Sequence, residues 1–108
     1  MKTLKFHPSL VELILEGSKT TTWRLWDDKN LSVDDEISFL DSYNKTEFAQ
    51  AIITEVKEKT FAELTEDDRD GHEKYSSDEK MYQSFSKHYV GKKINEDTKV
   101  KIIKFKLK

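Results

Sequence analysis

The segment from Gly17 to Arg24 carries the most concentrated polar chemistry in the chain. Within it, Lys19, Thr22 and Arg24 bring a cation, a hydroxyl and a second cation close together. Such a set can hold an anion or a carbonyl oxygen. The alternative is that a threonine run is simply good strand material, and that exposed Lys and Arg keep a strand edge soluble. The residue types alone leave both interpretations open.

The residues around this segment predict the order helix, glycine, strand. Pro8 fits the first turn of a helix, and four apolar residues then recur at helical spacing: Leu10, Val11, Ile14 and Leu15. Gly17 can adopt the left-handed conformation that ends a helix. Residues 20–25 are β-branched and aromatic, which favours a strand.

Side-chain alternation in that strand decides which residues can act together. In a regular strand Thr20, Thr22 and Arg24 share one face, and Lys19 would point to the other. Lys19 must therefore lie before the strand becomes regular if it is to work with Thr22.

Two tryptophans flank Arg24 and have different expected roles. Trp23 faces away from Thr22 and is expected in the core. Trp26 continues the parity of Thr22 and Arg24, so its ring could stack on a nucleobase. Because turn residues begin at Asp27, packing of Trp26 beneath the turn is the alternative.

The remaining signals predict an α+β fold. Strands are expected over residues 4–6, 36–40, 48–56 and 100–107 in addition to 20–25, and a capping box of Thr60 with Glu63 predicts a short helix around 62–66. A second box, Ser76 with Glu79, predicts a helix before the last strand, ended near Gly91. The last strand shifts its apolar phase between Ile102 and Ile103, as a bulge or a change of buried face would produce. Five or six strands with intervening helices predict a small, curved or barrel-like mixed sheet.

Composition limits the protein to one modest domain spanning residues 1–108. Hydrophobic residues make up 35% and charged residues 37% of the chain, and there is no cysteine to form a disulfide or a thiolate zinc site. The N-terminus lacks the apolar stretch of a signal peptide, and no window is long and apolar enough for a membrane span. We therefore expect a soluble, cytoplasmic protein with no membrane partner; the oligomeric state stays open.

Charge and metal-ligand patterns are weaker signals. The net charge is −2, yet lysines alternate along the C-terminal strand: Lys99, Lys101, Lys104, Lys106 and Lys108. A solvated strand face is the first interpretation, and contact with nucleic-acid phosphates the second. The acidic loop 66–71 resembles half of a calcium loop, but Ser77 stands where the bidentate glutamate would be. The three histidines lack metal-ligand spacing, so we expect neither a metal nor another cofactor.

The segment Gly17-Ser18-Lys19-Thr20-Thr21-Thr22-Trp23-Arg24, following a short strand and helix, resembles the hallmark G-x-K-x-x-T-x-R of the ASCH domain. The resemblance runs along nearly the whole chain, although Asp34 stands where many members carry glycine. It implies a PUA-like β-barrel and a module that binds or processes RNA.

In length and motif the chain most resembles the bacterial branch of acetylcytidine amidohydrolases. By that resemblance Lys19, Thr22 and Glu73 would be catalytic. We expect Thr20, Arg24 and Trp26 to bind the substrate.

An amide hydrolase needs a nucleophile or an activated water, a base and a donor for the oxyanion. Thr22 could supply the nucleophile. Lys19 could be the base only if burial or Arg24 lowers its pKa, and a neighbouring Glu73 would oppose that shift. Glu73 would orient the lysine or pass a proton to the leaving amine.

Three functions follow as hypotheses. The leading one is a pocket that binds RNA or a modified nucleoside around Lys19, Thr22, Arg24 and Glu73, with hydrolysis of an N-acyl group as the implied reaction. The second is a non-catalytic RNA-binding module that uses the C-terminal lysines and Trp26. The third is ribonuclease-like RNA processing at the same site.

Overall fold

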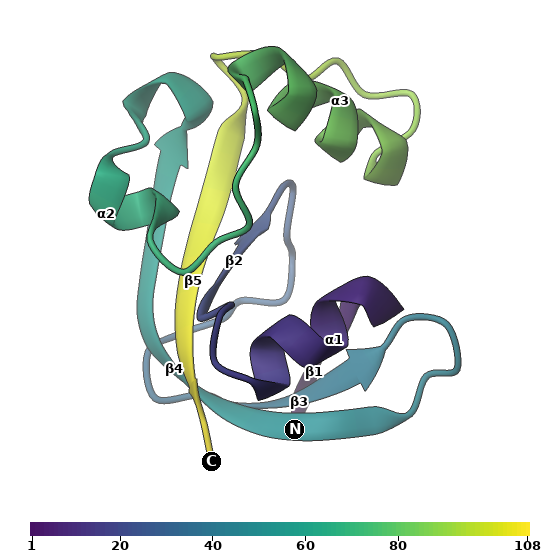
Figure 1. Cartoon of the computed structure of the whole chain (residues 1–108). Helices are drawn as coiled ribbons and strands as arrows, with labels where there is room; N and C mark the ends of the chain where they lie inside the picture. The colour runs from purple at the N-terminus through teal and green to yellow at the C-terminus, as the bar shows by residue number, and fades with distance from the viewer.

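One five-stranded sheet forms the body of the protein, and the computed structural model describes all of residues 1–108. The strands are β1 (Lys2–Phe6), β2 (Thr21–Arg24), β3 (Glu36–Asp41), β4 (Glu47–Thr60) and β5 (Lys99–Leu107). They lie in the order β1-β3-β4-β5-β2, with β1 parallel to β3 and every other pair antiparallel. The sheet curls into half a barrel whose open edges are β1 and β2 (Figure 1). The predicted α+β class and mixed, curved sheet are confirmed.

Three helices and one 3₁₀ turn complete the chain. They are α1 (Pro8–Leu15), the 3₁₀ turn η1 (Phe61–Glu63), α2 (Glu66–Arg69) and α3 (Asp78–His88). In Figure 1, α1 lies at the end of the sheet formed by β1 and β3, whereas α3 lies at the opposite end, beyond β2. No helix is long and apolar enough to cross a membrane.

Helix α1 begins and ends where the sequence predicts. Pro8 occupies its first turn, and the ring of His7 caps it by accepting the backbone N–H of Ser9 at 3.1 Å. Gly17 follows with φ of +89°, the left-handed conformation that ends the helix. The chain then enters β2 at Thr21.

The helix predicted around residues 62–66 is instead two pieces, η1 and α2. Leu64 between them is extended, with φ of −62° and ψ of 131°. Thr65 starts α2 afresh, because its hydroxyl accepts the backbone N–H of Asp68 at 3.2 Å. The N-cap at Thr65, two residues after η1 ends at Glu63, thus starts a new helix in place of a continuation of the first.

The residue that caps the N-terminus of α3 lies one position after the predicted one. The hydroxyl that caps it belongs to Ser77, which accepts the backbone N–H of Lys80 at 3.1 Å, and not to Ser76. The capping-box pattern favours Ser76, because Glu79 stands three residues after it and Lys80 three residues after Ser77, so the predicted cap was wrong by one residue.

Two apolar clusters lie on opposite faces of β5. The first joins α1, β1, β3, β4 and β5: Leu4, Phe6, Ile14, Leu31, Ile37, Phe39, Ala51, Ile53, Ile103 and Phe105. The second joins β2, η1, α3 and β5: Trp23, Leu25, Phe61, Met81, Phe85, Val100 and Ile102. Because alternate strand residues point to opposite faces, β5 changes its buried face between Ile102 and Ile103. This confirms the change of face predicted from its apolar phase.

Asp68 ties α2 to the sheet through one buried carboxylate. Its side chain is 0% exposed and accepts hydrogen bonds from Lys57 at 3.1 Å, Lys59 at 2.7 Å and the backbone N–H of Thr65 at 3.0 Å. Its carbonyl oxygen also accepts the indole N–H of Trp23 at 3.3 Å. Burial alone would raise the pKa of this carboxyl, but the donors around it hold the pKa well below its usual range. Elements α2, β4 and β2 therefore meet at this residue.

We expect Asp68→Asn to lower the free energy of unfolding by about 2 kcal/mol or more, because it removes charge-assisted hydrogen bonds at a buried site. The native pKa of Asp68 is depressed, so its contribution is present above about pH 4 and is lost as the pH falls further. Urea unfolding at pH 7 and at about pH 2.5 measures both effects. Asp67→Asn is the control, because the Asp67 side chain is 70% exposed. Equal losses in the two variants would contradict the anchoring role.

Candidate functional site

Lys19 lies in the turn between α1 and β2, outside the regular strand. This is the geometry that its cooperation with Thr22 required. The residue is 3% exposed, and its Nζ donates to the carbonyl oxygen of Thr21 at 2.8 Å. The same ammonium donates to the carboxylate of Glu73, which lies 54 residues further along the chain.

The loop that carries Glu73 is fastened to the start of β2 by backbone hydrogen bonds. The carbonyl oxygen of Gly71 accepts the N–H groups of Thr20 at 2.8 Å and Thr21 at 3.1 Å. The Thr21 hydroxyl donates to the carbonyl oxygen of Asp70 at 2.9 Å. Gly71 has φ of +79°, and a Cβ there would lie 2.0 Å from Oγ1 of Thr20. Only glycine allows the two segments to approach this closely.

Thr22 and Arg24 share a face of β2, as predicted, and contact each other. Nε of Arg24 donates to Oγ1 of Thr22 at 3.3 Å, and Nη2 donates to the carbonyl oxygen of Lys5 at 2.8 Å. The guanidinium also lies over the ring of Phe6, 4.8 Å from its centroid. Arg24 therefore spans the open side of the sheet from β2 to β1.

His72 joins the site from the same loop as Glu73. Its Nδ1 lies 2.9 Å from the carbonyl oxygen of Glu73 and 3.2 Å from the carboxylate Oε2. Its ring stacks on Trp23, with centroids 3.8 Å apart and planes at 17°. Trp23 is 4% exposed, which confirms its prediction as a core residue.

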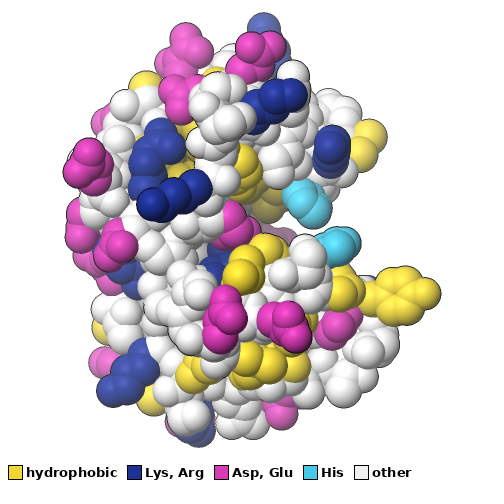
Figure 2. Space-filling model, in the orientation of Figure 1, with side chains coloured by type: hydrophobic (Ala, Val, Ile, Leu, Met, Phe, Trp, Pro, Cys, Tyr) yellow, Lys and Arg dark blue, Asp and Glu magenta, His cyan; other side chains and the backbone are white.

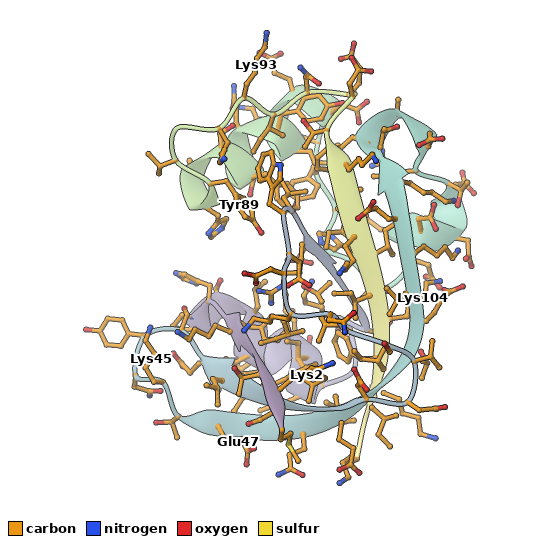
Figure 3. The ribbon with its side chains drawn as sticks, turned by 180° about the vertical axis from the view of Figure 1, so that it is seen from behind. Lys2, Lys45, Glu47, Tyr89, Lys93 and Lys104 are labelled. Atoms are coloured by element: carbon orange, nitrogen blue, oxygen red, sulfur yellow. The ribbon has the colours of Figure 1, made fainter.

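These side chains line one cleft with a volume of about 400 Å³, a size typical of small-molecule sites. Figure 2 shows the hollow between two lobes, with histidine side chains on both of its lips. Lys19, Thr22, Arg24 and Glu73 all contribute to its wall. Further lining residues, which the sequence did not connect with the site, are Phe6, Leu10, Tyr75, Phe85, His88 and Tyr89. In Figure 3, Tyr89 lies at the end of α3 that borders the cleft.

Two residues expected to bind substrate lie outside the cleft. Thr20 lines a separate depression beside the end of α1 and contributes to the cleft only through its backbone contact with the loop. Trp26 follows β2 with φ of +49° and is 52% exposed, so it is neither in the cleft nor buried beneath the turn. The ring of Tyr89 lies edge-on at 5.6 Å, and Nζ of Lys92 is 5.3 Å from the Trp26 ring centroid.

The C-terminal lysines are partly neutralised by carboxylates. Three of them form ion pairs: Lys101 with Asp27 at 3.1 Å, Lys104 with Asp67 at 3.2 Å and Lys108 with Glu36 at 3.0 Å. Figure 3 shows Lys104 beside β4, away from the cleft. Paired charges on a strand face favour the interpretation of a solvated surface over that of a phosphate-binding surface.

Burial sets the protonation of the site. It lowers the pKa of Lys19, and Arg24 adds to the effect, although Glu73 opposes it. Burial would raise the pKa of Glu73, but His72 and Lys19 outweigh it and lower that pKa. Burial, with Lys19 nearby, lowers the pKa of His72 to about 4. At neutral pH the imidazole is therefore uncharged and Glu73 is ionised.

Sequence reasoning reached Glu73 only through the family resemblance and found no use for His72. The signal that could have found both is Gly71, a glycine between an acidic helix and the pair His72-Glu73. A glycine at such a point often marks a close backbone approach. Tyr75 and the α3 residues carry no comparable local signal, because their place on the cleft depends on how α3 packs.

Comparisons with known proteins agree with this fold. The chain is similar to an ASCH domain from Lactobacillus crispatus, with a TM-score of 0.74 and 18% identity over 98% of this chain and 79% of that one. A protein from Enterococcus faecalis gives a TM-score of 0.76 at 15% identity, covering 92% of this chain and 69% of that one. The ASCH protein of Zymomonas mobilis gives 0.67 at 13%, covering 96% and 65%. A search of curated protein sequences finds no significant match.

The curled sheet and its helices define a PUA-like α+β domain. The family model of the ASCH domain matches residues 2–107, so the chain belongs to the ASCH domain family. ASCH domains are generally RNA-binding.

We expect Gly71→Ala to destabilise the protein by about 1–3 kcal/mol, because the new Cβ combines a left-handed backbone with a clash against Thr20. Gly91→Ala is the matched control, since Gly91 has φ of +84° and nothing within 4 Å of its Cβ position. Urea unfolding of both variants measures the difference. If Gly91→Ala loses as much stability as Gly71→Ala, the close docking of the loop is wrong.

The ring of His72 should titrate near pH 4 in an NMR experiment that follows histidine resonances. Because a depressed histidine pKa means that protonation opposes folding, His72 should cost stability as the pH falls from about 6.5 towards 4. Removing the neighbouring ammonium by Lys19→Met should raise this pKa, while burial keeps it below its usual value. A His72 pKa unaffected by Lys19→Met would contradict the electrostatic coupling.

Proposed function

We propose that the cleft binds a nucleobase, in RNA or in a free nucleoside, and hydrolyses an N-acyl group attached to it, as an acetylcytidine-type amidohydrolase does. The observation that carries the proposal is the contact between the buried ammonium of Lys19 and the carboxylate of Glu73, in a cleft that Thr22 also lines. A buried ammonium that serves only stability is an expensive choice, because an apolar residue could fill the same space. Ionisable side chains that meet in a cleft and have shifted pKa values are typical of catalytic sites.

Catalysis begins with the ion pair. When a ligand displaces water from the cleft, the charged pair loses solvation, and a proton passes from the ammonium of Lys19 to the carboxylate of Glu73. The lysine becomes a neutral amine that can act as a base, and the glutamic acid becomes a proton donor. The burial that already lowers the pKa of Lys19 supports this step.

The amine of Lys19 then takes the hydroxyl proton of Thr22, and Oγ1 attacks the acyl carbon. Arg24 already donates to Oγ1 through Nε. Its Nη1 makes no hydrogen bond to the protein and is free to stabilise the oxyanion. When the carbon–nitrogen bond breaks, the carboxylic acid of Glu73 protonates the leaving amine. An acyl ester on Thr22 remains, with Lys19 and Glu73 charged again.

Water completes the reaction. The carboxylate of Glu73 takes a proton from water as its oxygen attacks the ester, and Lys19 returns a proton to Oγ1 of Thr22 as the carbon–oxygen bond breaks. A proton then moves from Glu73 to Lys19, which restores the ion pair. The net change is amide plus water to amine plus carboxylic acid.

The matched substitutions Thr22→Ser and Thr22→Val separate the hydroxyl from the shape of the side chain. With purified protein and acetylcytidine, we expect Thr22→Ser to retain measurable deacetylation and Thr22→Val to abolish it. Lys19→Ala should lower kcat by about 10²–10⁴-fold, the usual contribution of a general base. Chromatography that monitors the release of cytidine measures the activity of all three variants.

Lys106→Ala serves as the lysine control, because Lys106 is exposed and lies outside the cleft. It should match the wild type. Deacetylation by the wild type no faster than by Lys19→Ala would end the enzymatic proposal and leave binding as the function of the cleft.

A further inference from the structure

The imidazole of His72 is held in one orientation. Its Nδ1 faces two oxygens of Glu73, the carbonyl at 2.9 Å and the carboxylate at 3.2 Å. A carbonyl oxygen and an ionised carboxylate only accept hydrogen bonds, so Nδ1 must carry the proton. The stacked indole of Trp23 on one side, and the ring of Tyr75 with its centroid 5.9 Å away, limit rotation of the imidazole.

This tautomer leaves Nε2 with an unshared electron pair. Nε2 of His72 has no hydrogen-bond partner in the protein, whereas every fully buried side-chain nitrogen and oxygen does have one. Nε2 is therefore reached by solvent, although the residue as a whole is 8% exposed. His72 lines the cleft, and Nε2 is the ring nitrogen that the protein leaves free for a ligand there.

Burial is the main reason that the ring stays neutral, and a neutral ring keeps Nε2 an acceptor. The groups that act on it are Lys19, Glu73 and the more distant Arg69. Burial and the two cations disfavour protonation, and the glutamate does not outweigh them. The structure thus presents an acceptor in the same cleft as the ammonium of Lys19 and the hydroxyl of Thr22.

We propose that His72 is a specificity residue whose Nε2 accepts a hydrogen bond from an exocyclic N–H of the bound base. The inference rests on the proposed function and deepens it. Cytosine carries an exocyclic amino group, and its N-acyl derivative still carries one N–H at that nitrogen. Uracil presents a carbonyl oxygen in the same place, which would face the lone pair of Nε2 without a proton between them. The cleft should therefore select cytosine-type bases over uracil.

Binding of the two unmodified nucleosides tests this selection without any reaction. Cytidine should bind the wild-type protein about tenfold or more tightly than uridine, the ratio that one lost hydrogen bond produces. Isothermal titration calorimetry or NMR titration measures both dissociation constants. Because neither ligand carries an acyl group, the result does not depend on Thr22.

Two substitutions of His72 test the roles of its two ring nitrogens separately. His72→Asn places an amide N–H near the position of Nδ1 and removes the group at Nε2. His72→Gln places an amide at Nε2, which can turn to accept from cytidine or to donate to uridine. We expect His72→Asn to weaken cytidine binding about tenfold with uridine unchanged, and His72→Gln to bind both nucleosides with similar affinity. A purely structural role would weaken both ligands equally.

Thermal unfolding of each variant shows that the comparison is made between folded proteins. A cytidine preference that survives in His72→Asn overturns the inference, and so does equal binding of the two nucleosides by the wild type. If the preference for cytidine holds and depends on His72 while acetylcytidine is not hydrolysed, the proposed reaction fails but the specificity role stands.

Discussion

The ion pair between the buried Lys19 and the partly buried Glu73 is the constraint on which the architecture of the site depends. Lys19 is 3% exposed, so its ammonium loses most of its hydration, and the protein must replace the lost water with acceptors. One acceptor, the carbonyl of Thr21, is local, and the other comes from 54 residues away. The fold must therefore hold two distant segments together to within hydrogen-bonding distance. The docking of Gly71 on the first residues of β2 provides that precision through backbone atoms, which do not change with side-chain rotamer.

The cleft exists because the sheet does not close. Strands β1 and β2 are its two edges and do not pair with each other. Arg24 crosses from β2 to the carbonyl of Lys5 in β1, so the opening is bridged by one side chain instead of a backbone ladder. A guanidinium has more donors than these contacts use, and it keeps its charge when buried. The residue that completes the open edge is thus also suited to hold an anionic or carbonyl oxygen.

Local signals in the sequence predicted most of the fold. The five strands, helix α1 with Gly17 at its end and the change of buried face in β5 each follow from residues close together in the chain. The site was less accessible. Lys19, Thr22 and Arg24 stand within one segment, so their proximity could be predicted, whereas the arrival of His72 required the loop docking that only the tertiary structure reveals. For Trp26 the local signal was misleading. Strand alternation predicted that it lies on the same face as Arg24, but the strand ends at Arg24 and Trp26 has a left-handed backbone that turns the chain away.

Stability and chemistry meet at Trp23. Its indole N–H is bound to the carbonyl of the buried Asp68, and its ring packs in the second apolar cluster with Phe85. The same indole stacks on His72, whose imidazole borders the cleft. A buried aromatic ring has few rotamers once it is packed on several sides, so it can transmit the rigidity of the core to a side chain that the core does not cover. Packing that has no chemical role of its own therefore sets the orientation of His72. Because His72 contacts Glu73, the same packing also helps to orient Glu73.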